Sequence, residues 1–270
     1  MLINEDTIDT ISYTDFVALV NQTNVPPGSF STLTKWRVNS NLNKESNILE
    51  AACTTGFSIL NLINESGSKG VGIDISESSV KRASENAIKM GLENQARFLS
   101  MDATKFESEE KFTHVVVGAG LGFFPQPNLM INKIQSLFGD EGYLLASPFY
   151  VTKDIPSELI DEAQKVFGIN PTNSSYKEVM ELYKGFDIYY EDRLKPELET
   201  TSELAHYCDS TITRACKIND VSSEIIYKKM YDRLYKIKDL SNRLREYQEY
   251  SILVLKYERK EYPNRFVELF

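Results

Sequence analysis

The fold is decided by a stretch that reads NILEAACTTGFSILNLI at 47–63, GVGIDIS at 70–76 and ARFLSMDA at 96–103. Three short apolar runs end at or just before Glu50, Asp74 and Asp102. Between the runs, apolar residues recur at the three- and four-residue steps of a helix. The stretch therefore predicts strand–helix–strand–helix–strand, with an acidic residue at the carboxyl end of each strand. Parallel α/β sheets bind their ligands at those ends.

Local signals predict where these elements begin and end. We expect strands over residues 48–50, 71–75 and 97–100. Ser76 can cap the second helix and Gly91 can stop it. The inner face of that helix is expected to carry four apolar residues: Val80, Ala83, Ala87 and Met90.

The residues at the strand ends suit an adenine nucleoside with a carboxylate tail. Asp74 is placed to accept both hydroxyls of a ribose. Gly56 lets the backbone pass close to a ligand, while the next helix points its N-terminal amides at an anion. Asp102 is placed to accept a hydrogen bond from an exocyclic amine such as that of adenine.

These motifs resemble those of the class I S-adenosylmethionine-dependent methyltransferases, over roughly residues 47–150. The family's first motif matches residues 50–56, its ribose-binding acid matches Asp74, and its adenine-contacting acid matches Asp102. FTHVVVGAG (112–120) matches the fourth strand, and Gly142 matches the glycine before the fifth. The resemblance implies S-adenosyl-L-methionine as cofactor, bound by Glu50, Ala51, Ala52, Gly56, Asp74, Ile75, Ser76, Asp102, Ala103 and Gly118.

The first motif departs from the family pattern at two positions. Family glycines fall on Ala52 and Thr54, which leaves Gly56 alone. Because a β-branched residue tolerates positive φ poorly, either the loop has another shape or φ stays negative at Thr54. A nicotinamide-binding fingerprint would need glycines at Ala52, Thr54 and Phe57, and it finds none.

Composition limits the class of protein and its partners. The chain has 270 residues, 41% of them hydrophobic, and a net charge of −9, which argues against broad contact with nucleic acid. Three cysteines without a CxxC pair suggest reduced thiols in a cytoplasm. No apolar run reaches transmembrane length and no signal peptide is visible, so no membrane partner is expected. Metal binding is not expected either, because no cluster has ligand spacing.

We expect a Rossmann-like α/β fold, with a doubly wound, mostly parallel sheet and an antiparallel last strand. Residues 1–46 would form an N-terminal helical lid, 47–150 the S-adenosylmethionine-binding core, and 151–270 the rest of the sheet with a helical insertion before the final strand. The leading helices either lie across the cofactor cleft or cover one sheet face. Ser31 or Thr34 can cap a helix that carries the apolar residues Leu33, Trp36 and Val38. Further helices are expected at 14–21, 157–167, 175–183, 201–216 and 222–247. Strands are expected at 114–118, 143–147, 186–190 and 250–257.

The substrate side is predicted from aromatic residues and one histidine. Phe30, Phe124, His206 and Tyr207 are the candidates for the substrate wall. His206 is also the candidate general base, although methyl transfer needs one only when the nucleophile holds its proton. His114 is expected to be structural.

The predicted function is methyl transfer to a small molecule by in-line displacement from the sulfonium. Two alternatives stay open: a non-catalytic subunit of the same fold that binds or regulates, and an RNA or protein methyltransferase. The apolar stripe of the last long helix, which starts at Ile226 and ends at Leu244, packs inside the chain or forms a homodimer contact.

Overall fold

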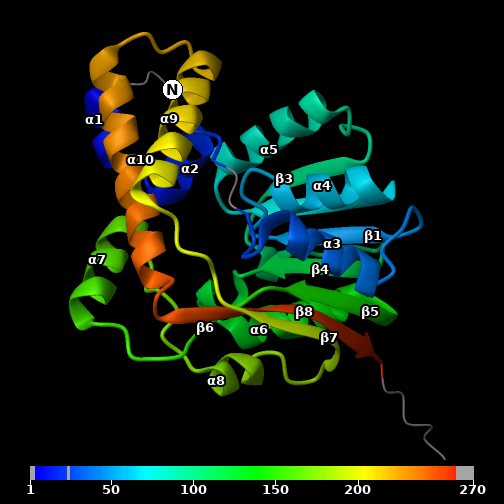
Figure 1. The fold of residues 1–270 in the computed structure, drawn as a ribbon. Coiled ribbons are helices and arrows are strands. Elements are labelled where there is room, and N and C mark those ends of the chain that lie inside the picture. The colour runs from blue at the N-terminus through cyan, green and yellow to red at the C-terminus, as the bar shows by residue number, and fades with distance from the viewer. Residues whose placement is uncertain (1–3, 23–24, 260–270) are drawn as a thin grey trace, which may run out of the picture.

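The computed structural model describes residues 4–22 and 25–259. Its centre is an eight-stranded sheet (Figure 1). Seven strands follow the order β3-β2-β1-β4-β5-β8-β6, and the eighth, β7, pairs with β8 along the edge opposite β5. β1 to β5 are parallel, and β8 runs antiparallel to β5. The strands are β1 (Asn47–Ala51), β2 (Lys69–Asp74), β3 (Ala96–Ser100), β4 (Phe112–Gly118), β5 (Phe138–Ala146), β6 (Phe149–Val151), β7 (Asp187–Leu194) and β8 (Gln248–Glu258). The predicted fold class is confirmed.

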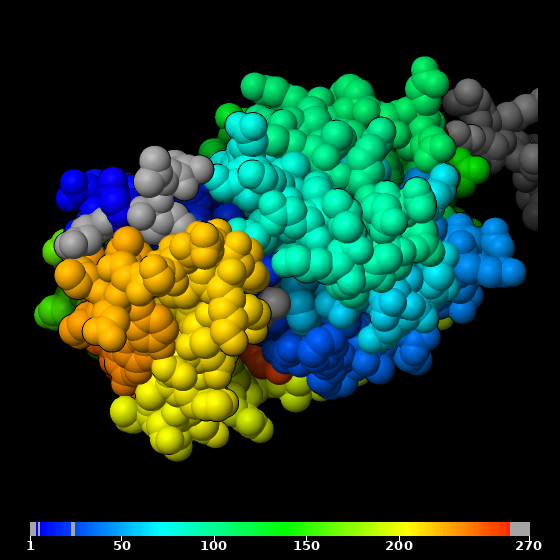
Figure 2. Space-filling view, turned by 90° about the horizontal axis from the view of Figure 1, so that it is seen from above, coloured from blue at the N-terminus to red at the C-terminus, as the bar shows by residue number. Residues whose placement is uncertain are grey.

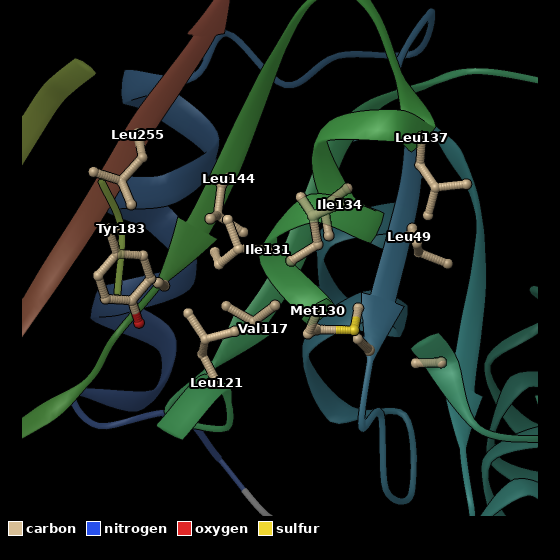
Figure 3. Close-up of a cluster of buried hydrophobic side chains, with 14 of the residues drawn as sticks. Leu49, Val117, Leu121, Met130, Ile131, Ile134, Leu137, Leu144, Tyr183 and Leu255 are labelled. Atoms are coloured by element: carbon tan, nitrogen blue, oxygen red, sulfur yellow. The ribbon is translucent and has the colours of Figure 1, made fainter. Parts of the chain in front are cut away.

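Helices cover both faces of this sheet because alternate strand residues point to opposite sides. Ile48 packs with α3 (Ser29–Asn39), α4 (Phe57–Ser66) and α5 (Glu77–Met90) on one face. Its neighbour Leu49 packs with α6 (Pro127–Leu137) and α8 (Tyr176–Glu181) on the other. Figure 3 shows this second cluster, in which Val117 and Leu121 lie beside Met130 and Ile131 of α6. The strand ends are therefore supported from both sides.

Four further helices form a bundle beside the sheet. α1 (Glu5–Thr10) and α2 (Tyr13–Leu19) pack against α9 (Thr201–Ile218) and α10 (Glu224–Leu244), as Figure 1 shows. Ile8, Phe16, Ile212 and Leu234 are buried at the centre of this bundle. α7 (Ser157–Phe167) packs on the C-terminal part of α10. We call α1, α2, α9 and α10 the lid bundle.

The lid bundle accounts for the apolar stripe of α10. Met230, Leu234, Ile237, Leu240 and Leu244 are all buried within the chain. The stripe is thus used for packing inside the chain, which corrects the alternative that it forms a homodimer contact.

The N-terminal helices lie in two places, and one of them is the predicted cover of a sheet face. α1 and α2 belong to the lid bundle, whereas α3 lies on the sheet, where Trp36 Nε1 donates to the Ala146 carbonyl at 3.3 Å. α3 begins at Ser29 after Gly28, earlier than predicted, and Val38 is exposed rather than buried.

Other predicted boundaries differ by a few residues. α7 spans the predicted 157–167, whereas the fourth and fifth strands begin earlier than expected, at Phe112 and Phe138. In α5 the buried residues are Ser79, Ala83 and Ala87, so Val80 and Met90 lie away from the predicted inner face.

Candidate active site

The parallel register brings the three predicted acidic residues to one edge of the sheet. Ala51 of β1 lies opposite Ile73 of β2, and Asp74 of β2 lies opposite Ser100 of β3. Glu50, Asp74 and Asp102 therefore sit at or just beyond the carboxyl ends of three adjacent strands. This is the edge at which a doubly wound sheet binds its ligand.

The turn after β1 keeps positive φ at all three alternate positions, although only one of them is glycine. The φ angles are 58° at Ala52, 46° at Thr54 and 83° at Gly56. Of the two alternatives that the sequence left open, a negative φ at Thr54 is therefore wrong. A left-handed conformation costs a non-glycine residue roughly 1–2 kcal/mol, so contacts from elsewhere must hold this turn. Ala52 itself is exposed at the edge.

Asp74 joins the turn to the start of α5. Its Oδ2 accepts a hydrogen bond from the Thr54 N–H at 2.9 Å, and its Oδ1 accepts one from the Ser76 N–H at 2.9 Å. Burial raises the pKa of this carboxyl, while the backbone hydrogen bonds act in the opposite direction. Each carboxylate oxygen has a second lone pair, so Asp74 still has acceptor capacity for a ligand.

Glu50, at the end of β1, makes a hydrogen bond with the backbone of α4. The carboxylate Oε2 accepts a hydrogen bond from the Ile59 N–H at 3.0 Å. Burial raises the pKa of Glu50 to about 8, because the charged form is poorly solvated there. The neutral carboxyl is therefore favoured there, and Glu50 acts through its hydrogen bond to the backbone of α4.

Asp102 is open on one side. Its Oδ1 accepts hydrogen bonds from the N–H and Oγ1 of Thr104, which lower the pKa of the carboxyl. Its Oδ2 lies 3.8 Å from Lys105 Nζ, and 43% of the side chain is exposed. Ala103 next to it is buried and begins a short 3-10 turn. Asp102 therefore presents an acceptor to the edge.

The loop after β4 faces the turn after β1. Gly118 has a φ of 51°, and a side chain placed there would meet no neighbouring atom within 4 Å. A Cβ at Gly120 would lie 4.0 Å from the Cβ of Ala52. Leu121 anchors the loop in the core beneath (Figure 3). The two loops thus approach each other at Gly120 and Ala52, while Gly118 has room beside it.

Ile75 and Ser76, predicted to flank the adenosine, have different environments. Ile75 is 76% exposed, whereas Ser76 is buried. Ser76 Oγ accepts from the Ser79 N–H at the start of α5 and donates to Asp15 Oδ1 of α2 at 3.0 Å. Ile75 is the one of the two with a free side-chain surface.

The four predicted substrate-wall residues are not brought together. Phe30 is 55% exposed and packs edge-to-face on Phe57, with ring centroids 5.2 Å apart. Phe124 packs against the core on the α6 face of the sheet. Tyr207 lies on α9, where Lys238 Nζ is 4.6 Å from its ring centroid.

His206 lies in a shallow groove between α9 and α10. Tyr227, Tyr231, Asp209 and Asp232 are among the residues that line it, and none of the strand-end carboxylates does. Seen from above, a separate furrow runs between α9, in yellow, and the blue-to-cyan part of the core (Figure 2). The groove around His206 thus belongs to the lid bundle. His114 is buried, and its Nε2 lies 3.1 Å from the Ser40 carbonyl oxygen, as expected for a structural histidine.

Residues from outside the predicted motifs also reach the turn. Thr55 Oγ1 donates to the Gln22 carbonyl at 3.2 Å, and Asn86 Nδ2 donates to the Thr55 carbonyl at 3.0 Å. Among the described residues, the buried side-chain Oε1 of Gln22 has no hydrogen-bond partner. No local pattern in the sequence marks these residues, because their partners are far away along the chain.

These observations test whether the edge fits S-adenosylmethionine. The cofactor has ribose hydroxyls, an adenine amine and an ammonium group as donors, and a carboxylate as acceptor. The edge has acceptors at Asp74 and Asp102, and a helix N-terminus after Gly56. Donors and acceptors therefore match in kind.

Within the described part of the chain, no three His, Cys, Asp or Glu side chains are grouped so that they could hold a metal ion. Over the same residues, every helix is too short or too polar to cross a bilayer.

A doubly wound sheet with antiparallel last strands and acidic strand ends defines the class I methyltransferase fold. The family model described as "Methyltransferase domain" matches residues 42–201, more than half of the chain. The chain therefore belongs to this methyltransferase domain family. The predictions of an S-adenosylmethionine-dependent methyltransferase and of its fold are thereby confirmed.

Similar structures cover nearly the whole chain. The crystal structure of MccD protein is 25% identical with a TM-score of 0.69, and the match covers 87% of this chain and all of that one (100%). A methyltransferase from Geobacter sulfurreducens, titled as SAM-dependent and in complex with S-adenosyl-L-homocysteine, is 17% identical with a TM-score of 0.64, covering 89% and 96%.

The match to one sequence relative covers a smaller part of the chain. A Haemophilus influenzae protein, described as uncharacterized, is 24% identical over 108 residues, which are 40% of this chain and 43% of the relative. The matched stretch is thus less than half of that relative.

Proposed function

We propose that the protein transfers a methyl group from S-adenosylmethionine to a small-molecule acceptor. The observation that carries the proposal is the row of acidic side chains at the carboxyl ends of β1, β2 and β3, beside the turn at 51–56. Family membership supports the same cofactor, as does the S-adenosylhomocysteine complex of the Geobacter protein.

Each part of the edge has one role in this proposal. Asp74 accepts the ribose hydroxyls, Asp102 accepts the adenine amine, and the turn from Glu50 to Gly56 receives the methionine end. Ala51, Ala52, Ile75, Ser76, Ala103 and Gly118 supply the surrounding surface. When bound, the cofactor supplies an electrophilic methyl group. The residues of the chain then contribute orientation and exclusion of water.

The lid bundle supports a small acceptor rather than a polymer. Its helices α1, α2, α9 and α10 stand beside the strand-end edge (Figure 1), and a furrow lies between α9 and the core (Figure 2). A bundle beside the edge can close over a small molecule and keep water out. The net charge of −9 does not favour a nucleic-acid backbone.

The test combines binding and transfer. Calorimetry with S-adenosylhomocysteine measures cofactor affinity, and methyl-labelled S-adenosylmethionine is then incubated with small-molecule, protein and RNA fractions of a cell extract. We expect binding, and label in the small-molecule fraction that Asp74→Asn abolishes. A wild-type protein without affinity for either nucleoside would identify a non-catalytic scaffold. Label in protein or RNA would overturn the acceptor class.

A further inference from the structure

The turn after β1 holds a conformation that its own residues do not favour. Ala52 and Thr54 have positive φ, and Thr54 is β-branched. The backbone therefore follows a path suited to glycine at both positions, so the surrounding contacts must compensate for the missing glycines.

The backbone around Thr54 is held on both sides. Its N–H donates to Asp74 Oδ2 at 2.9 Å, which fixes the side that faces β2. The carbonyl of the next residue, Thr55, accepts from Asn86 Nδ2 at 3.0 Å. The two bonds lie on either side of the φ and ψ angles of Thr54, so together they restrain its left-handed conformation.

Asn86 is itself held in place by the N-terminal segment. Its Nδ2 donates to Asn21 Oδ1 at 3.0 Å, and its Oδ1 accepts from Asn21 Nδ2 at 3.1 Å. Both hydrogens of the Asn86 amide are therefore used, one on Thr55 and one on Asn21. The neighbouring Gln22 carbonyl accepts from Thr55 Oγ1 at 3.2 Å.

The same segment is docked on α5 by further polar contacts. Arg82 donates through Nε to the Ala18 carbonyl at 3.2 Å and through Nη2 to Asn219 Oδ1 at 3.3 Å. Arg82 lies one helical turn before Asn86 on α5. The end of α2 and the end of α9 thus approach the turn along one face of α5.

We propose that Asn86 is a positioning residue for cofactor binding, and that it acts with Asn21. It holds the turn at 52–56 in the shape that glycines would adopt freely, so cofactor affinity depends on the N-terminal segment docked on α5. The inference rests on the proposed function, because it assigns the turn to the cofactor.

The experiment measures S-adenosylhomocysteine affinity by calorimetry in a double-mutant cycle. Asn86→Asp keeps the size of the side chain but removes its donor, and Lys89→Ala, exposed on the same helix, is the matched control. We expect Asn86→Asp to weaken binding about tenfold and the control to stay within about twofold. Thr54→Gly relieves the strained position, so its gain in affinity should be about fivefold larger in the Asn86→Asp background than in the wild type.

Asn21→Ala keeps the test valid if Asn86→Asp does not fold. It removes the outer partner of the amide, so we expect a loss of about threefold that Thr54→Gly also restores. An effect of Thr54→Gly that is equal in both backgrounds, or unchanged affinity in both asparagine variants, would overturn the positioning role alone. A wild-type protein that does not bind S-adenosylhomocysteine would refute the proposed function instead.

Discussion

The hydroxyl of Ser76 donates a hydrogen bond to the carboxylate of Asp15 at 3.0 Å. Ser76 caps α5, directly after the predicted ribose-binding edge, and Asp15 lies in the first turn of α2. This contact joins the cofactor edge to the lid bundle. A conformational change at the cofactor edge is therefore expected to affect the lid bundle, and the reverse.

Cofactor binding is expected to protect α2 more than α3 from hydrogen exchange. α2 is docked on α5 by polar contacts, whereas Leu33 and Trp36 place α3 in the core. Polar contacts that open locally respond most to a bound ligand. Exchange measured with and without S-adenosylhomocysteine checks this, and Asp15→Ala should reduce the gain in α2. Equal gains in both helices would contradict the expectation.

Asp74→Asn is expected to weaken S-adenosylhomocysteine binding by about tenfold to a hundredfold. The substitution removes the charge that would accept two ribose hydroxyls, a loss of roughly 1.4–2.8 kcal/mol. Glu77→Gln is the matched control, because Glu77 is an exposed carboxylate three residues after Asp74, in the first turn of α5. Calorimetry measures both. Unchanged affinity in a folded Asp74→Asn variant would assign the ribose to another residue.

Glu50→Gln is expected to alter the pH dependence of stability. Burial raises the pKa of Glu50 to about 8, above its unfolded value of 4.5. Its stabilising contribution is therefore complete below the unfolded pKa and is lost as the pH rises toward the folded one, at a slope of up to ~1.4 kcal/mol per unit. Urea unfolding of the wild type and the variant at about pH 5 and about pH 8 measures this.

The free energy of unfolding should fall between these two conditions in the wild type, and fall less in Glu50→Gln. A difference between the two proteins that is the same at both pH values would mean that Glu50 is ionised throughout.

His206→Asn is expected to leave turnover within about twofold and to keep the acid limb of the pH profile. His206 lies in the groove between α9 and α10, lined by lid residues such as Tyr227 and Tyr231. Lys228→Ala, in the same groove, is the matched control. A loss of about 10²–10⁴-fold in turnover, together with loss of the acid limb of the pH profile, would restore His206 as the base.

Much of the sheet was predictable because its signals are local. The apolar runs that end at Glu50 and Asp74 are strands buried on both faces, and Gly91 ends α5 with a positive φ of 70°. The antiparallel final strand was also predicted. Boundaries were less accurate where polar residues extend a strand, as in the β5 stretch that begins at Phe138.

The site was predictable only in part. Strand-end positions indicated Asp74 and Asp102, since the ends of parallel strands must meet at one edge. The sequence did not indicate Asn86, whose amide reaches Thr55 and Asn21, respectively 31 and 65 residues away. Residue preferences disfavour a positive φ at Thr54, yet its φ is 46°, and hydrogen bonds with Asp74 and Asn86 lie on either side of it.

The sequence by itself determined the alternation of strands and helices from β1 to β3 and the acidic edge, because apolar periodicity and capping residues act over a few neighbouring positions. It did not indicate α1, α6 or β6. Only the tertiary structure decided how the N-terminal helices divide, with α1 and α2 in the lid bundle and α3 on the sheet. The tertiary structure alone also decided that the turn at 52–56 keeps the positive φ angles typical of glycine. Both depend on side chains distant in sequence that meet only when the chain is packed, and local preferences of roughly 1–2 kcal/mol yield to such contacts.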